Sequence, residues 1–321
     1  MRIAVSGSIA TDHLMTFGGK FTDTLIAEKL DKISVSFLVG DLEIRRGGVA
    51  GNISYGLGCL GLKPLLVGSV GQDFAEYASW LTAHGVDTSS VRTSETRHTA
   101  RFTATNDETG NQIASFYPGA MSEDGEIDII SLASANGVDL VVIGAGDPVA
   151  MQRFTADCRA AGLRFAADFS QQVAFLDGDS MRTLIEGAAY LFCNEYEAAV
   201  IEQKAGWSSE DILDRVETRI ITLGSAGARV ERKGAEPVVV GPVKDATLVE
   251  PTGSGDAFRS GFLAGTAWGL PMERAIQLGN LMAVHALEVV GPQEYDLALA
   301  DRAKHAYGAE AAEEIAAHLP A

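Results

Sequence analysis

The chain is short of cysteine and of positive charge. Only three cysteines occur in 321 residues, at Cys59, Cys158 and Cys193, and none forms a Cys-x-x-Cys pair. This scarcity excludes a disulfide framework or a zinc ribbon and indicates buried thiols in a reducing compartment. The 25 lysine and arginine residues face 43 acidic residues, so the formal net charge is −18. Because nucleic-acid binding depends on a basic surface, we expect no nucleic-acid partner.

Long apolar runs are also missing. No run approaches the roughly 20 residues that a membrane-spanning helix needs, and the first residues begin a strand without a signal-peptide layout. We therefore expect no membrane partner and a cytoplasmic location. What the chain does have is a hydrophobic content of 46%, which is enough to build a sizeable core.

Short apolar segments alternate with helical patterns from about residue 50 onward. The predicted strands are hydrophobic throughout, as parallel strands buried on both faces are, and span residues 3–7, 65–70, 140–144, 165–168, 190–194 and 220–223. The predicted helices fall near residues 51–60, 73–84, 148–161, 180–187 and 195–204, and within an almost entirely helical stretch, 255–319. This alternation predicts an α/β fold in one domain, residues 1–321, with a doubly wound, mostly parallel sheet and helices on both faces.

Two stretches interrupt this alternation with side chains that are apolar and polar in turn. They are residues 33–46 and the pair 99–106 and 111–117, which a turn-rich segment joins. Such a pattern predicts antiparallel strands with one solvated face. We expect a small antiparallel sheet, inserted as residues ~10–46 and ~97–119, that covers the main sheet as a lid. Its exposed edge strand would allow a homodimer through the lid sheets.

The most informative run is residues 250–256, Glu-Pro-Thr-Gly-Ser-Gly-Asp, directly before an apolar helix. Gly253, Ser254 and Gly255 let the backbone approach a ligand closely, and the free amides and dipole of a helix start favour an anion. Asp256 would stand beside this anion as the catalytic base for an attacking hydroxyl. We expect its pKa near or below the usual value of about 4, because a helix N-terminus favours the carboxylate. A capped glycine-rich turn without a ligand is the alternative.

Further candidate residues would bind a sugar. Gly48 precedes a predicted helix that contains Asn52, whose amide can donate to and accept from a hydroxyl. Asp12 follows the first strand, near the edge where α/β sheets bind ligands, and a carboxylate can accept from both hydroxyls of a ribose diol. Each of these residues could instead cap a turn. Weaker candidates for sugar or base contacts are Ser8, Ser36, Gln171 and Gln172.

Phe102 and Phe116 are candidates for stacking on a purine base. Each lies seven positions from Thr109, near the centre of the turn between the two predicted strands. Residues equidistant from the centre of a hairpin oppose one another, so both rings would share one face of the lid. The alternative is that the rings form the core of the lid or a dimer contact, and a register slip of one residue would separate them.

The glycine-rich elements at residues 47–52 and 252–256 resemble those of the ribokinase-like (PfkB) carbohydrate and nucleoside kinases. Residues 194–197 and 222–227 resemble two further elements of that family, in the same order along the chain. The resemblance implies ATP as phosphoryl donor and Mg²⁺ near Asn194 and Glu197, bound directly or through water, with room for a monovalent cation such as K⁺. The nucleotide-binding residues that it implies are Asn194, Thr222, Leu223, Gly224, Ser225, Ala226 and Gly227.

Segments 7–14, 34–39, 98–103 and 113–121 are similar to the mycobacterial-type bacterial adenosine kinases. This similarity implies phosphorylation of the 5′-hydroxyl of adenosine to give AMP. Two residues depart from the pattern, since Glu250 replaces Asp or Asn and Phe175 replaces a basic residue.

Three other functions compete with this one. A ribokinase or fructokinase would share the fold, and a catalytically silent nucleoside-binding regulator would share the binding site. A nicotinamide dehydrogenase is disfavoured, because no Gly-x-Gly-x-x-Gly motif follows the first strand.

Overall fold

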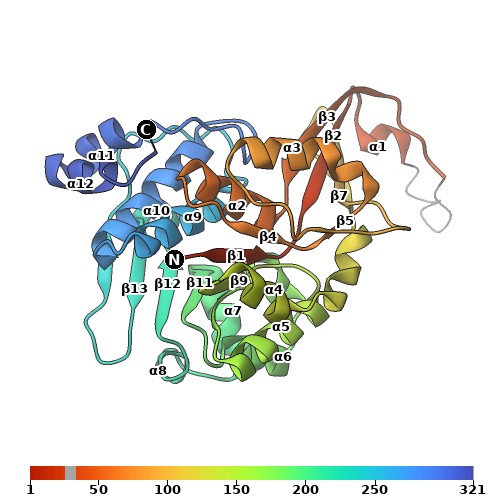
Figure 1. Ribbon diagram of the computed structural model, residues 1–321. Coiled ribbons are helices and arrows are strands. Elements are labelled where there is room, and N and C mark those ends of the chain that lie inside the picture. The colour runs from red at the N-terminus through yellow and green to blue at the C-terminus, as the bar shows by residue number, and fades with distance from the viewer. Residues whose placement is uncertain (26–33, 321) are drawn as a thin grey trace.

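An eight-stranded sheet forms the centre of the molecule in the computed structural model, which describes residues 1–25 and 34–320 (Figure 1). The strand order is β14-β13-β12-β11-β10-β9-β1-β4. The pairs from β4 to β12 are parallel, whereas β13 and β14 extend the sheet antiparallel, so the mostly parallel sheet is confirmed. The strands are β1 (Ile3–Ser6), β4 (Leu65–Val67), β9 (Leu140–Ile143), β10 (Arg164–Asp168), β11 (Tyr190–Asn194), β12 (Thr218–Thr222), β13 (Ala228–Glu231) and β14 (Val238–Val240).

Helices cover both faces of this sheet (Figure 1). One layer contains α2 (Val49–Cys59), α3 (Ala75–Ala83), α9 (Ser254–Ala267), α10 (Met272–Leu287), α11 (Leu299–Tyr307) and α12 (Ala309–Ala316). The other contains α4 (Ile129–Asn136), α5 (Pro148–Ala161), α6 (Gly178–Ile185), α7 (Glu195–Ala205) and α8 (Ser209–Leu213). No helix in the described ranges is long and apolar enough to cross a bilayer.

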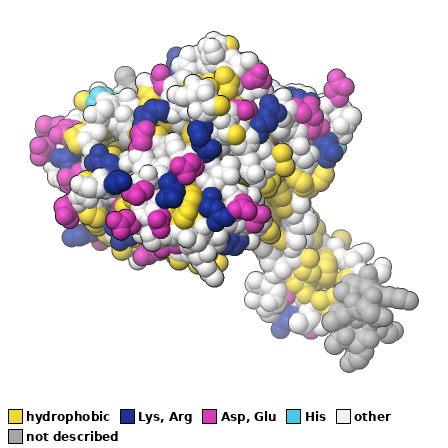
Figure 2. Space-filling model, turned by 90° about the horizontal axis from the view of Figure 1, so that it is seen from below, with side chains coloured by type: hydrophobic (Ala, Val, Ile, Leu, Met, Phe, Trp, Pro, Cys, Tyr) yellow, Lys and Arg dark blue, Asp and Glu magenta, His cyan; other side chains and the backbone are white. Residues whose placement is uncertain are grey.

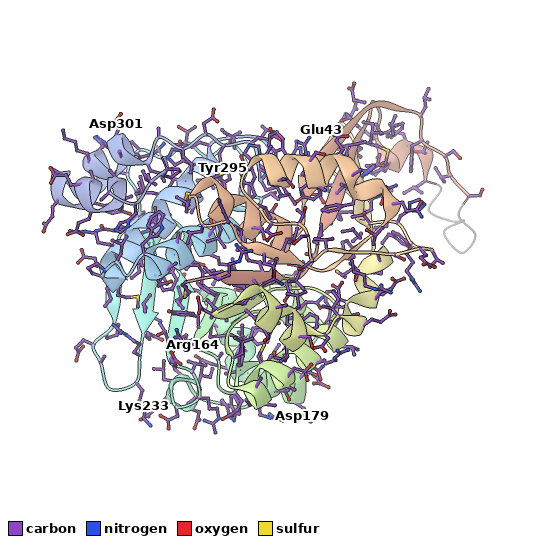
Figure 3. The ribbon with its side chains drawn as sticks, viewed as in Figure 1. Glu43, Arg164, Asp179, Lys233, Tyr295 and Asp301 are labelled. Atoms are coloured by element: carbon purple, nitrogen blue, oxygen red, sulfur yellow. The ribbon has the colours of Figure 1, made fainter. Side chains whose placement is uncertain are left out.

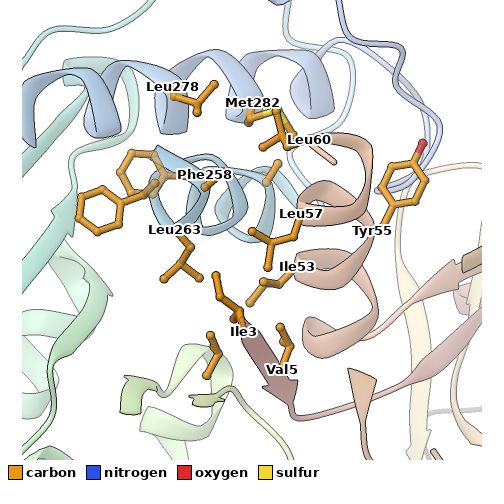
Figure 4. Packing of buried hydrophobic residues seen from close by; sticks show 14 of the residues in the cluster. Ile3, Val5, Ile53, Tyr55, Leu57, Leu60, Phe258, Leu263, Leu278 and Met282 are labelled. Atoms are coloured by element: carbon orange, nitrogen blue, oxygen red, sulfur yellow. The ribbon is translucent and has the colours of Figure 1, made fainter. Parts of the chain in front are cut away.

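The strand β1 shows how the two cores are formed. Ile3 and Val5 pack into the cluster that α2, α9 and α10 complete, which Figure 4 shows from close by. Ala4 points the other way, into the cluster beneath α4 to α7. A parallel strand buried on both faces needs apolar side chains at every position, which explains the continuous apolar runs in the sequence.

Polar side chains cap the N-termini of several helices at the carboxyl edge of the sheet. The side chain of Asp147 accepts hydrogen bonds from the first-turn amides of α5, with Pro148 in the first turn. Asn194 and Glu197 form a capping box at the start of α7. Loops and helix N-termini therefore gather at this edge, where α/β sheets bind their ligands.

A second sheet, the lid, lies beside this edge with the strand order β3-β2-β7-β8 (Figure 1). Its strand β2 pairs antiparallel with β3 and parallel with β7, and Phe102 pairs with Phe116, so the expected hairpin register is confirmed. The carboxylate of Asp107 stabilises the hairpin turn by accepting hydrogen bonds from the amides of Thr109 and Asn111. It also accepts from the amide of Phe21, outside the turn. The lid strands are β2 (Ala10–Phe17), β3 (Val39–Gly47), β7 (Ala100–Asn106) and β8 (Gln112–Tyr117).

Two of the expected strands differ from those in the structure. The strand expected from residue 33 begins only at Val39, because its partner β2 ends at Phe17, opposite Val39. Residues 34–38 have no regular structure, and residues 26–33 of the expected lid lie outside the described residues. The strand expected over 65–70 is split after Val67, and its second part pairs separately. Other short elements are α1 (Phe21–Thr24), β5 (Ser69–Val70) and β6 (Arg92–Thr93), together with four 3-10 helices in the described residues.

Candidate active site

Two cavities meet at the first turn of α9. The lid cavity, of about 500 Å³, lies between lid and core and is lined by Asp12 and Phe116 on one side and Asp256 on the other. The core cavity, of about 630 Å³, is lined by Ser254 and Gly255 together with residues from β12, the β12–β13 turn and α10. Both cavities have the size of small-molecule sites. Consecutive residues of one helical turn therefore face two different spaces.

Glycine makes the start of α9 possible. Gly253 has a φ of 78°, in the left-handed region, and a Cβ atom there would lie 2.4 Å from the Cβ of Pro292. The amide of Ser254 donates to the carbonyl of Pro251 at 3.2 Å, so it closes the turn instead of facing a ligand as expected. The amides that follow in the first turn have no acceptor within the helix. An anion would therefore be held by the amides after Ser254.

Asp256 is 9% exposed and lines the lid cavity. Its Oδ2 accepts from Asn52 Nδ2 at 2.9 Å, and the Oδ1 of Asn52 accepts in turn from Gln293 Nε2 at 2.9 Å. Burial raises the pKa of Asp256 to about 7, against the opposing effects of Arg259 and of the hydrogen bond from Asn52. The expected pKa near or below 4 is therefore wrong, because desolvation outweighs the helix N-terminus.

Arg259 and Asp168 form a buried ion pair beside Asp256 that the sequence analysis missed. Arg259 Nε lies 2.6 Å from Asp168 Oδ2, and Nη2 donates to Oδ1 at 2.7 Å. The two side chains are 9% and 0% exposed. The available signal was an arginine one turn after Asp256 in an otherwise apolar helix, since a buried charge requires a partner.

Asp12 is the second carboxylate of the lid cavity. It pairs across the lid strands with Arg45, but the guanidinium of Arg45 is held by Glu250 and Glu43, each at 2.7 Å. Burial raises the pKa of Asp12 to about 6, with Arg45 lowering and Glu250 raising it. Asp12 is thus a partly desolvated acceptor that faces the cavity. Glu250 also connects the lid to the segment that precedes α9.

Phe102 and Phe116 form one wall of the lid cavity. They are direct cross-strand partners, and Phe102 also lies beside Asp12 in the parallel pair of β2 and β7. Phe116 is 50% exposed, so part of its ring is not packed against other protein side chains. An aromatic face of this kind can stack on a flat ligand.

Most of the residues predicted for the sugar and base line the lid cavity, and two do not. Ser36 is exposed, in the segment before β3 that has no strand partner. The Nε2 of Gln172 donates to the carbonyl of Gly146 at 2.7 Å, so the amide is used within the protein. Phe175 is 81% exposed and lines neither cavity. The predicted residues that line the lid cavity are Ser8, Asp12, Gly48, Asn52, Phe102, Phe116, Gln171, Gly253 and Asp256.

The predicted nucleotide residues gather less completely around the core cavity. Those that line it are Thr222, Gly224, Ser225 and Gly227. Leu223 packs against the hydrophobic core under the sheet instead, and Ala226 is exposed without lining the cavity. Apolar residues complete the walls, including Val243 and Leu287. The combination of an apolar slot and the N-terminus of α9 suits a heterocycle that carries phosphates.

Asn194 and Glu197 lie next to this cavity. Asn194 pairs with Thr222 across β11 and β12. Each side chain uses one oxygen in the capping box, where Asn194 Oδ1 and Glu197 Oε2 both accept backbone amides at 2.8 Å. Within the part of the chain that the structure describes, no group of three or more His, Cys, Asp or Glu side chains is arranged to hold a metal.

Comparison with known proteins decides the family. Residues 12–298 match the sequence profile described as pfkB family carbohydrate kinase. The chain belongs to this family. It is 27% identical over 271 residues to the nucleoside kinase of Methanocaldococcus jannaschii, covering 83% of this chain and 87% of that protein. It is 28% identical over 258 residues to the cytidine kinase of Thermococcus kodakarensis, covering 76% and 88%.

The solved structures agree with the family. The nucleoside kinase of Burkholderia thailandensis in complex with inosine has a TM-score of 0.81 and 33% identity to this chain, with 95% of this chain and 98% of that one covered. The ribokinase-like fold expected from the sequence is therefore confirmed, together with membership of the PfkB kinases.

Proposed function

We propose that the protein transfers the γ-phosphoryl group of ATP to the 5′-hydroxyl of adenosine, giving AMP and ADP. The observation that carries the proposal is the first turn of α9, where Gly255 faces the core cavity and Asp256 faces the lid cavity. A phosphate donor in one cavity and a hydroxyl acceptor in the other would meet at this turn. Relatives described as nucleoside kinases, one of them with bound inosine, support a nucleoside as the acceptor.

The lid cavity fits the parts of a purine nucleoside. Asp12 would accept from the ribose diol, and Asn52 would contact a sugar hydroxyl beside Asp256. Phe102 and Phe116 would stack on the base, for which a free sugar offers no aromatic face. The cavity thus offers polar groups for the ribose and an aromatic wall for the base. Both are needed only for a nucleoside, so the cavity favours a nucleoside over ribose or fructose.

In the proposed step, the 5′ oxygen forms a bond to the γ-phosphorus while the bond from that phosphorus to the oxygen of the β-phosphate breaks. The hydroxyl proton passes to the carboxylate of Asp256, and ADP leaves. A carboxyl with a pKa of about 7 is a stronger base than an ordinary aspartate, and about half of it is ionised at neutral pH. Phosphoryl transfer proceeds through a loose transition state, so positioning and neutralisation of charge by the helix amides supply most of the rate.

Mg²⁺ bound to ATP would neutralise charge on the phosphates during transfer. Glu197 would hold it through water with Oε1, the oxygen that lies outside the capping box, and Asn194 would contact the same water with the second lone pair of Oδ1. A magnesium ion retains several waters and needs few protein ligands when phosphates are present. We also propose that turnover depends on a monovalent cation such as K⁺. Measuring kcat after K⁺ is replaced by tetramethylammonium tests this dependence.

A homodimer through the lids is a further part of the proposal. The strands β3 and β8 are the edges of the lid sheet. Their outward side chains include Leu42, Ile44, Ile113 and Tyr117, which are 56%, 59%, 47% and 44% exposed. Figure 2 shows hydrophobic side chains on the part that projects from the core beside the grey residues. Light scattering of the protein and of Ile44→Asp tests the dimer, which the new charge should dissociate.

A substrate panel tests the proposed function. Adenosine, inosine, cytidine, ribose and fructose are each supplied with ATP and Mg²⁺, and the release of ADP is followed by a coupled assay. We expect the highest kcat/KM for adenosine. A preference for ribose or fructose would establish a sugar kinase, and nucleoside binding without ADP release would establish a silent regulator.

A further inference from the structure

The mechanism above makes no use of Arg259, although its guanidinium lies within the active-site region. Arg259 is 7% exposed and sits one turn after Asp256 on α9. Its Nη1 packs against the first turn of that helix, since a Cβ atom on Gly255 would lie only 2.8 Å from it. Its Nε and Nη2 face Asp168, at the end of β10. The guanidinium thus links the carboxyl edge of the sheet to the turn that both cavities share.

The groups around Asp256 are mostly acidic. Arg259 comes from the same helix, Asp168 from β10 and Glu197 from α7. The uncharged neighbours are Asn52 of α2, which hydrogen-bonds to Asp256, and the buried phenols of Tyr77 and Tyr295. The charge of Asp256 contributes to the raised pKa of both phenols. Without Arg259, three carboxyl groups would face one another in a poorly hydrated space, where like charges repel strongly.

We propose that Arg259 is a positioning residue that keeps Asp256 ionised, and that Asp168 sets how much of its charge reaches Asp256. The proposal rests on the proposed function in that it takes Asp256 as the base. Arginine remains protonated at every physiological pH, so it suits this role better than lysine or histidine. The hydrogen bond from Nη2 and the close contact of Nε, both with Asp168, hold the guanidinium in one place.

A purely structural role would be to anchor α9 to β10. Buried ion pairs are often neutral for stability compared with apolar side chains of similar size, so anchoring alone is a weak reason for this pair. The two roles differ in a measurable way. An anchor affects activity equally at all pH values, whereas an electrostatic partner moves the pKa of the base.

The test is the acid limb of kcat at saturating adenosine, which reports the pKa of the base in the enzyme–substrate complex. Titration of Asp12 acts on KM and does not enter this limb. Activity requires ionised Asp256 and falls as the pH drops through its pKa. Arg259→Met removes a positive charge near Asp256 and should move the acid limb to higher pH by about one unit or more. Asp168→Asn removes a negative charge near Asp256 and should move the acid limb to lower pH by about one unit. Limbs that stay in place, or that move in the same direction in both variants, would overturn the proposal.

Matched controls separate this effect from a change of net charge. Arg164 and Glu217 form an ion pair of 2.6 Å at the opposite end of β10, and Figure 3 labels Arg164 there. Arg164→Met and Glu217→Gln repeat the two charge changes and should leave the limb in place. Arg259→Lys keeps the charge and should restore most of the wild-type limb. Movement of the limb in the control variants would overturn the assignment to Arg259.

Two measures protect the test from misfolding and from failure of the proposed function. If Arg259→Met does not fold, the Arg259→Met/Asp168→Asn variant removes both charges. Because Arg259 lies on the same helix as Asp256, one turn away, and packs against Gly255, its loss should dominate and move the acid limb to higher pH, and any other result contradicts the proposal. Titration of the ¹³C signal of the Asp256 carboxyl, assigned with Asp256→Asn, reports the same shifts without turnover. Shifts seen by NMR in a protein that does not phosphorylate nucleosides would leave this inference standing while the proposed function fails.

Discussion

The two sides of the lid cavity are built in different ways. On the core side, Asp256, Asn52 and Gln293 are 9%, 6% and 1% exposed and form one chain of hydrogen bonds. On the lid side, Phe116 is 50% exposed, and every residue of β8 is exposed. The proposed base is therefore held by packing from several helices, whereas the groups expected to bind the nucleobase lie on a single sheet. The proposed phosphoryl transfer requires fixed geometry, and we expect the lid to move toward its ligand.

Contacts at the base of the lid join the two sides. Arg45 on β3 donates to Glu250, in the segment that precedes α9, at 2.7 Å. Arg46 lies over the ring of Trp80 on α3, 4.3 Å from its centroid. Both contacts come from the base of the lid, so we expect its outer part to move relative to Asp256. The lid end that carries Glu43 lies well away from the sheet residue Arg164 in Figure 3.

Replacing the fixed base should have the largest effect. Asp256→Asn keeps the shape of the side chain but removes the proton acceptor, so kcat should fall by about 10²- to 10⁴-fold. Nucleoside affinity should change by less than about threefold, because the carboxylate proposed for the diol and the two rings proposed for the base lie on the lid. Steady-state kinetics and calorimetric titration with adenosine measure the two quantities. Asp301→Asn, an exposed residue of α11, is the matched control, and retained turnover in Asp256→Asn would remove this residue from the role of base.

The lid carboxylate should affect binding rather than turnover. Asp12→Asn should raise KM for adenosine by about 10- to 100-fold, since hydrogen bonds to a charged group contribute about 1.5–3 kcal/mol. Because the pKa of Asp12 is raised to about 6, the wild-type KM should increase as the pH falls through 6, where an ordinary aspartate would remain ionised. The KM of the variant should not depend on pH in this range. A wild-type KM that is constant from pH 5 to 8 would contradict the assignment of Asp12 to the diol.

The sequence predicts those features that depend on neighbours along the chain. The register of Phe102 and Phe116 follows from a turn centred near Thr109, because pairing in a hairpin is set by the residues that join its strands. The start of α9 follows from Gly253 and Asp256, since helix termini have local signatures. Such features are fixed by a few adjacent residues, and the structure agrees with them.

Features that depend on distant parts of the chain were missed. Gln293 orients Asn52 across 241 residues, and Arg259 pairs with Asp168 across 91. The pKa of Asp256 was expected in the wrong direction, because burial by other elements decides it and helix position does not. The late start of β3 has the same origin, since a strand extends only as far as its partner.

Removing one ring from the lid should have a smaller effect than removing its carboxylate. Phe116→Ala should raise KM for adenosine by roughly fivefold, because an aromatic pair contributes about 1 kcal/mol beyond burial, while kcat should hardly change. Tyr117→Ala is the matched control, since the next residue on β8 points to the opposite face of the lid. Steady-state kinetics of both variants measure the effect. Equal KM values for Phe116→Ala and the wild type would argue against stacking on the base.

The smallest overall effect is expected from loosening the lid itself. Burial raises the pKa of Asp107, but hydrogen bonds from Asn111 and Thr109 outweigh it and leave the pKa low, so the carboxylate is the form that holds the turn. Asp107→Asn removes this charge, and the amides of residues 106–112 should exchange with deuterium roughly tenfold faster. The thermal midpoint should move by less than about 2 °C, because the turn contacts neither main core. Hydrogen exchange and calorimetry measure these quantities. A large fall in the midpoint would mean that lid and core unfold as one unit, and the contrast between a fixed core and a separable lid would then be wrong.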